Sequence, residues 1–364
     1  MQRRSKILLG AGALVAVGGI FILDLLIDGG AFREIEPHFG GSCEKVGGVV
    51  GVEDITFDHE GGFAYLSSHD RRTWMRTGVA EGGIYRYRAG SYATPLEIPH
   101  DYKAPLHPHG IGLWKNPEGA DRLFIVNHPN GGEGSLDMSE SRAEVLVFDL
   151  LEDRLQFVRK VSSEEGYSLN DVAPDGPDSF YASIDMGSSS KFMRTLETFG
   201  RLPLGGIARG NAFNIWKIEG GLTYPNGVAV SPDGQYLMVA ETTGNRILAY
   251  RRGAEDAAVL TLVAETDAGT ASDNIEWAED GSFWIGAHPV ALAFPGHKKD
   301  AANRSPSQAI RVTFDGSAFD IEEVYLNDGD PISGSSVAAP MGEHLLIGSV
   351  FEPFFLDCTR ARPE

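Results

Sequence analysis

Six short segments of the chain repeat one pattern, in which two polar residues precede an apolar run, a turn and a second apolar run. The segments begin at Glu53, His109, Asn170, Asn226, Asp273 and Ser335. Each reads as two adjacent antiparallel strands, because apolar and polar residues alternate around turn residues such as Pro232-Asp233-Gly234. The starting positions lie 47 to 62 residues apart, a period typical of β-propellers. We therefore predict an all-β chain that forms a six-bladed β-propeller.

The polar pair at the start of each copy is the candidate site. Its first members are Glu53, His109, Asn170, Asn226, Asp273 and Ser335, and its second members are Asp54, Gly110, Asp171, Gly227, Asn274 and Ser336. Equivalent positions of the blades surround one central channel, so these side chains would converge, and the acids among them would repel one another unless a cation were bound. Oxygen ligands without cysteine favour Ca²⁺. The alternative is that Asn and Asp simply begin strands at turns.

Length and charge limit the possible organisation and partners. Without the first 35 residues, the 364-residue chain leaves about 55 residues for each of six blades, so we predict one propeller domain over residues 36–364. The formal net charge is −20, and after the N-terminus basic residues occur at most in adjacent pairs such as Arg71-Arg72 and Lys298-Lys299. This charge disfavours nucleic-acid binding, which depends on neutralising phosphates.

Residues 1–35 read as a membrane-directed segment. Arg3, Arg4 and Lys6 precede the apolar run Ile7–Leu23, which is 17 residues long. That length is the short limit for a membrane span and exceeds most signal-peptide cores. We predict an uncleaved signal-anchor, with a cleaved signal peptide as the alternative. The positive flank would leave the propeller on the extracytoplasmic side, periplasmic or extracellular.

Cys43 and Cys358 are the two cysteines of the chain, and they bracket nearly all of the predicted propeller. A disulfide between them would join the first and last blades, which favours an oxidising compartment. Two separate buried thiols are the alternative.

Two further features carry candidate functional residues. His109 and His128 lie on neighbouring predicted strands, beside the candidate ring of acids and amides. Apolar residues spaced three to four apart in 191–199 predict a short amphipathic helix. Over the channel mouth it would form a membrane-contacting surface or a lid made of Phe192, Met193, Leu196 and Phe199. If the same helix packed on the rim instead, it would have no role in function.

The polar stretch His69–Gly83 is too long for a hairpin turn and would overhang a face of the disc.

The motifs of the chain resemble those of the serum paraoxonase/arylesterase family. The matching segments are Glu53-Asp54, Pro108-His109-Gly110-Ile111, Val126-Asn127-His128-Pro129, Leu169-Asn170-Asp171, Asn226-Gly227, Asp273-Asn274-Ile275 and Gly286-Ala287-His288-Pro289. The two cysteines and the apolar N-terminus also resemble that family. The resemblance covers nearly the whole chain after residue 40. It implies a six-bladed propeller with two Ca²⁺ ions in its central tunnel.

The resemblance also implies roles for individual residues. The ligands of a catalytic ion would be Glu53, Asn170, Asn226, Asp273 and Asn274, and those of a structural ion Asp54, Asp171 and the backbone carbonyl of Ile111. His109 and His128 match the family's proposed histidine dyad, and Tyr224 and His288 match substrate-contacting positions. The chain departs from the family at His69–Gly83, at Ala287, where vertebrate members have cysteine, and at Tyr224, where phenylalanine is usual.

These observations predict a calcium-dependent hydrolase of small-molecule lactones and aryl esters. Water deprotonated by His109, with His128 behind it, would attack a carbonyl polarised by Ca²⁺. Asp273 is the rival base or nucleophile. Two other functions stay open at this point. One is a gluconolactonase-like sugar lactonase, and the other is a non-catalytic membrane-tethered propeller that binds partners and contains only structural calcium.

Overall fold

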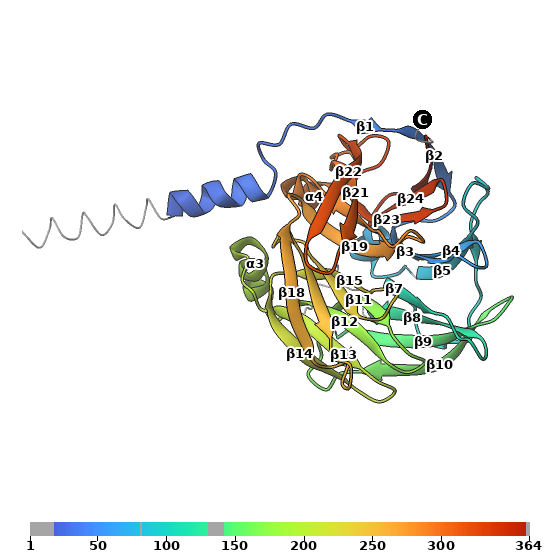
Figure 1. The fold of residues 1–364 in the computed structure, drawn as a ribbon. Helices are drawn as coiled ribbons and strands as arrows, with labels where there is room; N and C mark the ends of the chain where they lie inside the picture. The colour runs from blue at the N-terminus through green and yellow to red at the C-terminus, as the bar shows by residue number, and fades with distance from the viewer. Residues whose placement is uncertain (1–17, 81, 130–141, 362–364) are drawn as a thin grey trace, which may run out of the picture.

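The computed structural model describes residues 18–80, 82–129 and 142–361. Six antiparallel sheets surround a central axis as a six-bladed propeller (Figure 1). Their innermost strands are β3 (Val52–Asp58), β7 (Pro108–Trp114), β11 (Ser168–Pro174), β15 (Pro225–Val230), β19 (Ala271–Trp277) and β23 (Ser335–Met341). Each innermost strand contacts the next, and β23 contacts β3, which closes the ring. The predicted six-bladed, all-β fold is confirmed.

The remaining strands complete the blades outward. Blades one to three contain β4 (Phe63–His69), β5 (Gly82–Tyr87) and β6 (Leu96–Glu97); β8 (Asp121–Asn127), β9 (Glu144–Leu150) and β10 (Leu155–Ser162); and β12 (Phe180–Met186), β13 (Gly205–Gly210) and β14 (Ile215–Leu222). Blades four to six contain β16 (Tyr236–Glu241), β17 (Arg246–Arg252) and β18 (Leu260–Asp267); β20 (Phe283–His288), β21 (Ser307–Phe314), β22 (Phe319–Asn327) and β1 (His38–Phe39); and β24 (His344–Ser349), β25 (Phe354–Arg360) and β2 (Gly41–Gly47).

The core consists of six apolar clusters, each between two neighbouring blades. In one of them, Phe124 of β8 faces Phe180 of β12, with ring centroids 5.7 Å apart. The alternation read from the sequence supplies these contacts, because every second residue of a strand points toward one adjacent sheet. Each blade is therefore stabilised by both of its neighbours.

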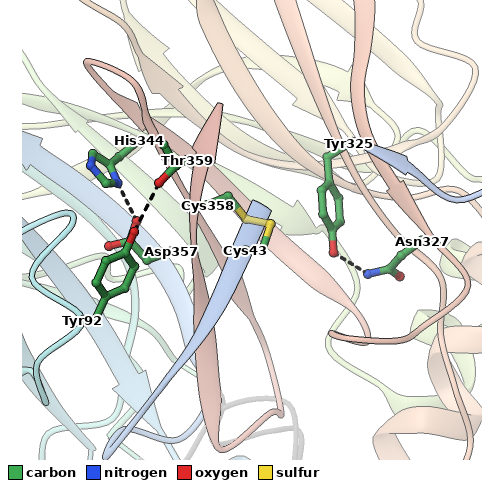
Figure 2. The surroundings of a disulfide bond; sticks show 8 residues. All are labelled: Cys43, Tyr92, Tyr325, Asn327, His344, Asp357, Cys358 and Thr359. Carbon is green, nitrogen blue, oxygen red and sulfur yellow. Dashed lines mark hydrogen bonds and ion pairs between the residues drawn. A yellow bond between two sulfur atoms is a disulfide. The ribbon is translucent and has the colours of Figure 1, made fainter. Parts of the chain in front are cut away.

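The N-terminal strand β2 closes the ring by joining the last blade as its outermost strand. Cys43 of β2 lies directly opposite Cys358 of β25, and the two form a disulfide that spans 315 residues of sequence. Figure 2 shows this bond beside Asp357, which accepts a hydrogen bond from His344 Nδ1 (2.8 Å). Because it restricts the unfolded chain, a disulfide across a loop of this length stabilises the folded state by on the order of 5 kcal/mol. The predicted disulfide is confirmed.

Helices occupy the loops between second and third strands. The stretch that was expected to overhang the disc contains α2 (Arg71–Thr77), and α4 (Phe294–Lys299) follows the short helix η3 (Ala291–Ala293). Because neighbouring strands run antiparallel, these loops lie on the face where the innermost strands begin. That face therefore brings the polar pairs and the helices together.

The predicted amphipathic helix is confirmed as α3 (Lys191–Gly200). Ser190 Oγ caps its first turn by accepting a hydrogen bond from Met193 N (3.3 Å). Buried Glu197 accepts hydrogen bonds from the backbone N–H groups of Gly187 (2.7 Å) and Ser188 (3.0 Å). The helix is thus tied to the loop that leaves β12.

Residues 18–28 form a helix that precedes the propeller (Figure 1). Most of the predicted anchor Ile7–Leu23 lies outside the described residues. Within the part of the chain that the structure describes, every helix is too short or too polar to cross a membrane. The anchor stays a prediction.

Candidate active site

The pairing of each innermost strand with its neighbour is irregular at the polar pair. The register shifts between Val52 and Asp54 of β3, between Pro108 and Ile111 of β7, and at the corresponding points of the other four innermost strands. Such irregularities redirect side chains and interrupt the ladder of backbone hydrogen bonds. The sequence repeat therefore marks the places where each blade turns polar side chains toward the axis.

Five of the six first members meet in one cavity of about 380 Å³. These are Glu53, His109, Asn170, Asn226 and Asp273, and all five side chains are buried. The sixth, Ser335, is outside the cavity, and its hydroxyl donates a hydrogen bond to the carbonyl oxygen of Ala287 (3.0 Å). The structure thus brings together most of the predicted ring, including both predicted carboxylates.

The donor atoms around this cavity fit a hard cation. The Oδ1 atoms of Asn170, Asn226 and Asn274 are buried and accept no hydrogen bond within the described residues. Asn274 Nδ2 donates to Glu53 Oε1 (3.0 Å), which fixes the orientation of the amide. A buried acceptor without a donor is costly unless something else satisfies it. Three amide oxygens beside two carboxylates are suitable ligands for Ca²⁺.

Acidic residues alone do not form this site. Within residues 18–80, 82–129 and 142–361, no three His, Cys, Asp or Glu side chains are placed to hold a metal by themselves. The candidate set instead combines two carboxylates with three amides, so the amide oxygens are needed to complete the coordination of a cation.

Two second members of the polar pairs, Asp54 and Asp171, form a layer that does not line the cavity and that links neighbouring blades. Asp54 Oδ1 and Oδ2 accept hydrogen bonds from Ile55 N (2.8 Å) and from Ile111 N of the next blade (2.7 Å). Asp171 repeats the arrangement with Val172 N (2.7 Å) and Val228 N (2.8 Å). Each aspartate therefore connects two innermost strands.

Two glycines leave room for this layer. A Cβ on Gly110 would lie 2.4 Å from Asp171 Oδ1, and one on Gly227 would lie 2.5 Å from the carbonyl oxygen of Asp273. No Cβ could approach that closely without displacing its neighbour. Glycine in the polar pair is therefore required by the adjacent blade.

Burial dominates the electrostatics of the two aspartates. Burial, and then the charge of Glu53, raise the pKa of Asp54 well above its ordinary value. Burial, and then the charge of Asp54, raise the pKa of Asp171 in the same way. Because a nearby cation would oppose both effects, these carboxylates are suitable partners for a second ion. The carbonyl oxygen of Ile111 is the predicted third ligand. For this residue the structure shows a hydrogen bond from the backbone N–H to Asp54.

Two histidines contact the two carboxylates of the cavity. His109 Nε2 lies 3.3 Å from Glu53 Oε1, and His288 Nε2 lies 3.0 Å from Asp273 Oδ2. The ring centroids of His109 and His128 are 5.0 Å apart. His109 and His288 line the cavity, whereas His128, which packs against His109, does not. The contact between His288 and Asp273 was not anticipated from the sequence, which placed His288 as a substrate contact.

Buried backbone contacts hold His128 in place. His128 N donates to the carbonyl oxygen of His107 (3.1 Å), and His107 Nδ1 lies 2.9 Å from the carbonyl oxygen of His128. Asn127 Oδ1 accepts a hydrogen bond from His107 N (2.7 Å). The ends of β7 and β8 are therefore fixed to each other where the two predicted dyad residues lie.

The predicted substrate contacts lie in different surroundings. Tyr224 lines the cavity and has a φ of 52°, a left-handed conformation that costs a tyrosine about 1–3 kcal/mol. Phe199 of α3 also lines the cavity. Phe192, at the other end of α3, is 71% exposed and does not line it. The end of α3 that approaches the cavity is thus its C-terminal end.

Several lining residues were missed by the sequence analysis. Most lie in loops between second and third strands, on the face described above, and they are Met186, Thr198, Thr242, Thr243, Asn245, Phe294, Pro295, Lys298 and Val350. The strand order alone could have indicated these residues, because it places all loops between second and third strands on the same face as the polar pairs. Leu25, Asp28 and Gly29, which follow the apolar N-terminal run, also line the cavity. Nothing in their sequence marked them for it.

Comparison with known proteins places the chain among ester hydrolases. The sequence model of the arylesterase family matches residues 89–358. Serum paraoxonase/arylesterase 1 of Mus musculus is 27% identical over 340 residues, which cover 88% of this chain and 90% of the relative. Serum paraoxonase/arylesterase 2 of Homo sapiens is 28% identical over 334 residues, with the same coverage.

Solved structures with low sequence identity share the fold. A luciferin-regenerating enzyme superimposes with a TM-score of 0.52 at 13% identity, covering 88% of this chain and 95% of that one. The calcium-binding protein regucalcin from Agrobacterium tumefaciens superimposes with a TM-score of 0.52 at 16% identity, covering 90% and 96%. At these identities the likeness concerns the architecture alone.

Proposed function

The chain belongs to the arylesterase family and is an ester-hydrolysing enzyme, and from this premise we propose that it hydrolyses lactones and aryl esters in a calcium-dependent reaction in the cavity. The observation that carries the proposal is the set of three buried amide oxygens that lack donors, beside two buried carboxylates. This arrangement is costly for a protein without a cation and favourable with one.

We assign the ligands in two layers. Glu53, Asn170, Asn226, Asp273 and Asn274 would hold the ion at the cavity, and Asp54, Asp171 and the Ile111 carbonyl would hold a second ion below it. When bound, the upper Ca²⁺ would supply positive charge for the substrate carbonyl oxygen and for the negative charge that develops there on attack.

His109 is the proposed general base. Its imidazole lines the cavity, and a water molecule there would lose its proton to His109 as it attacks the ester carbonyl. Glu53, 3.3 Å from Nε2, would stabilise the imidazolium that forms. His128 would orient the ring of His109 from behind. Asp273 is the rival base, but its contact with His288 and its place among the proposed ligands leave it less available for proton transfer.

Apolar side chains at the cavity favour substrates with an apolar part. The lining includes Met186, Phe199, Leu292, Phe294 and Val350. These surfaces would contact an aryl leaving group or an alkyl side chain, and they offer few partners for the hydroxyl groups of a sugar lactone. Phe192 is not part of this lining, because its side chain is exposed and does not reach the cavity.

A panel of substrates tests the proposal. Purified full-length protein should hydrolyse phenyl acetate and alkyl-substituted δ-lactones with higher kcat/KM than gluconolactone. Hydrolysis should be followed by phenol absorbance and by acid release, with heat-denatured protein as the control. A preference for gluconolactone would favour the sugar-lactonase alternative, and hydrolysis of none of the esters would refute the proposal.

We also propose that the N-terminal segment anchors the enzyme in a membrane, with the propeller on the extracytoplasmic side. Arg3, Arg4 and Lys6 before the apolar run motivate this orientation. The disulfide agrees with an oxidising compartment. The membrane fraction should contain the full-length protein, and alkaline carbonate should not extract it. Recovery of soluble protein that begins near Ala31 would show that the segment is removed.

A further inference from the structure

The helix formed by residues 18–28 ends directly at the cavity. Leu25, Asp28 and Gly29 line the cavity together with Leu292, which precedes α4. Leu292 N lies 3.3 Å from the carbonyl oxygen of Gly29, and a Cβ on Gly29 would lie 2.6 Å from Leu292 Cγ. The packing at this contact is too close for any larger residue. The N-terminal segment therefore forms part of the cavity wall.

One side chain of the propeller contacts this helix at two points. Arg201 caps the C-terminus of α3 in a left-handed conformation, with a φ of 49°. Its Nη2 and Nη1 atoms contact the carboxylates of Asp24 and Asp28, which are one helical turn apart. Arg201 itself lines the cavity. In Figure 1 the N-terminal helix reaches the propeller on the side where α3 and α4 lie.

A second polar contact supports the same position. Asn245 Nδ2, in the loop after β16, donates a hydrogen bond to the carbonyl oxygen of Asp28 (3.0 Å). The end of the helix is thus held from α3, from the β16–β17 loop and from the loop before α4. Of these contacts, only that of Arg201 combines two ion pairs, so its loss should have the largest effect on where the helix lies.

We propose that Arg201 is a specificity-determining residue, which holds the N-terminal helix against the cavity so that substrate side chains lie between Leu25 and Phe199. The proposal rests on the proposed function, because it names a determinant of substrate choice at the same site. A lactone without a side chain would occupy the polar part of the cavity and would not reach this wall. A lactone with a long alkyl chain would contact both helices.

The test uses full-length protein in detergent and the variant Arg201→Met, which keeps an unbranched side chain but removes the charge. For δ-undecalactone, KM should rise roughly 4- to 15-fold, the factor expected when one or two methylene groups of the substrate lose their apolar contacts. For δ-valerolactone, KM should stay within about twofold, and kcat should change little for either substrate. Arg304→Met is the matched control, because Arg304 also contacts two carboxylates, those of Asp328 and Asp330, but lies outside the cavity lining.

A readout that needs no activity distinguishes this proposal from the proposed function. Hydrogen exchange of the amides in residues 24–31 and 289–294 should accelerate in Arg201→Met and stay unchanged in Arg304→Met. Unchanged exchange would overturn the proposal whether or not the enzyme hydrolyses lactones. Equal KM changes for the two lactones would also overturn it. Charge exchange provides the rescue, since Arg201→Glu combined with Asp24→Lys and Asp28→Lys should recover most of the wild-type KM for δ-undecalactone.

Discussion

Replacing His109 with glutamine should lower lactone turnover by at least about 100-fold, the lower bound for the loss of a general base. Glutamine keeps a polar side chain of similar length near Glu53 Oε1, now 3.3 Å from His109 Nε2, but it has no nitrogen that accepts a proton near neutral pH. Calcium affinity should not change, because Ca²⁺ prefers oxygen ligands. Steady-state kinetics and calcium titration by calorimetry give both quantities.

Two comparisons make the result specific. His128→Gln should reduce turnover less than His109→Gln, because His128 lies behind His109 and does not line the cavity. His38→Gln, at an exposed histidine near Glu323, should leave the kinetics unchanged. Near-normal turnover in His109→Gln would transfer the role of base to Asp273. Loss of calcium from the same variant would make His109 a ligand.

Alanine substitutions at the two layers of the axis should have different effects. Asp54→Ala and Asp171→Ala each remove a carboxylate that accepts two backbone N–H groups, one from the next blade. Leaving two buried donors without acceptors costs about 1–3 kcal/mol for each donor, so each variant should lose roughly 2–6 kcal/mol of stability. Thermal unfolding in excess calcium measures this loss as a lower Tm.

Asn274→Ala should instead act mainly on catalysis. It removes a proposed ligand of the upper ion and two hydrogen bonds from Nδ2, to Glu53 Oε1 and to the Glu53 carbonyl oxygen, so turnover should fall strongly. Tm should fall less than in the Asp54 and Asp171 variants, because no buried donor is left without an acceptor. Ser42→Ala, at an exposed residue of β2, is a suitable control for both measurements. If the Asp54, Asp171 and Asn274 variants lose stability and turnover in the same proportion, the division into a structural and a catalytic layer is wrong.

The sequence was sufficient to predict the positions that meet at the axis. Glu53, Asn170, Asn226 and Asp273 were found because a propeller repeats its topology, so equal places in the repeat become equal places around the axis. The pairing of Cys43 with Cys358 followed from the need to close the ring. Both inferences depend on symmetry and connectivity, which are encoded in the order and spacing of strands.

Contacts made once, without a repeat, could not be predicted in this way. The contact of His288 with Asp273 depends on two side chains of the paired strands β19 and β20, and the contacts of Arg201 with Asp24 and Asp28 depend on how α3 and the N-terminal helix pack. The repeat does not specify these contacts, because the side chains that make them are not repeated from blade to blade. Of the predicted lid residues, Phe199 lines the cavity and Phe192 does not, because helical spacing predicts a shared face but not how the helix is tilted over the cavity.

The return of activity with calcium is the most direct test of the central claim that a cation bound by these oxygens supports ester hydrolysis. Wild-type protein should be treated with chelator, freed of it under conditions that preserve the fold, and assayed with phenyl acetate while calcium is added stepwise. We expect negligible activity without calcium and recovery that follows occupancy of the site, with Asn274→Ala requiring more calcium than wild type. Undiminished hydrolysis by folded protein from which calcium has been removed would contradict it.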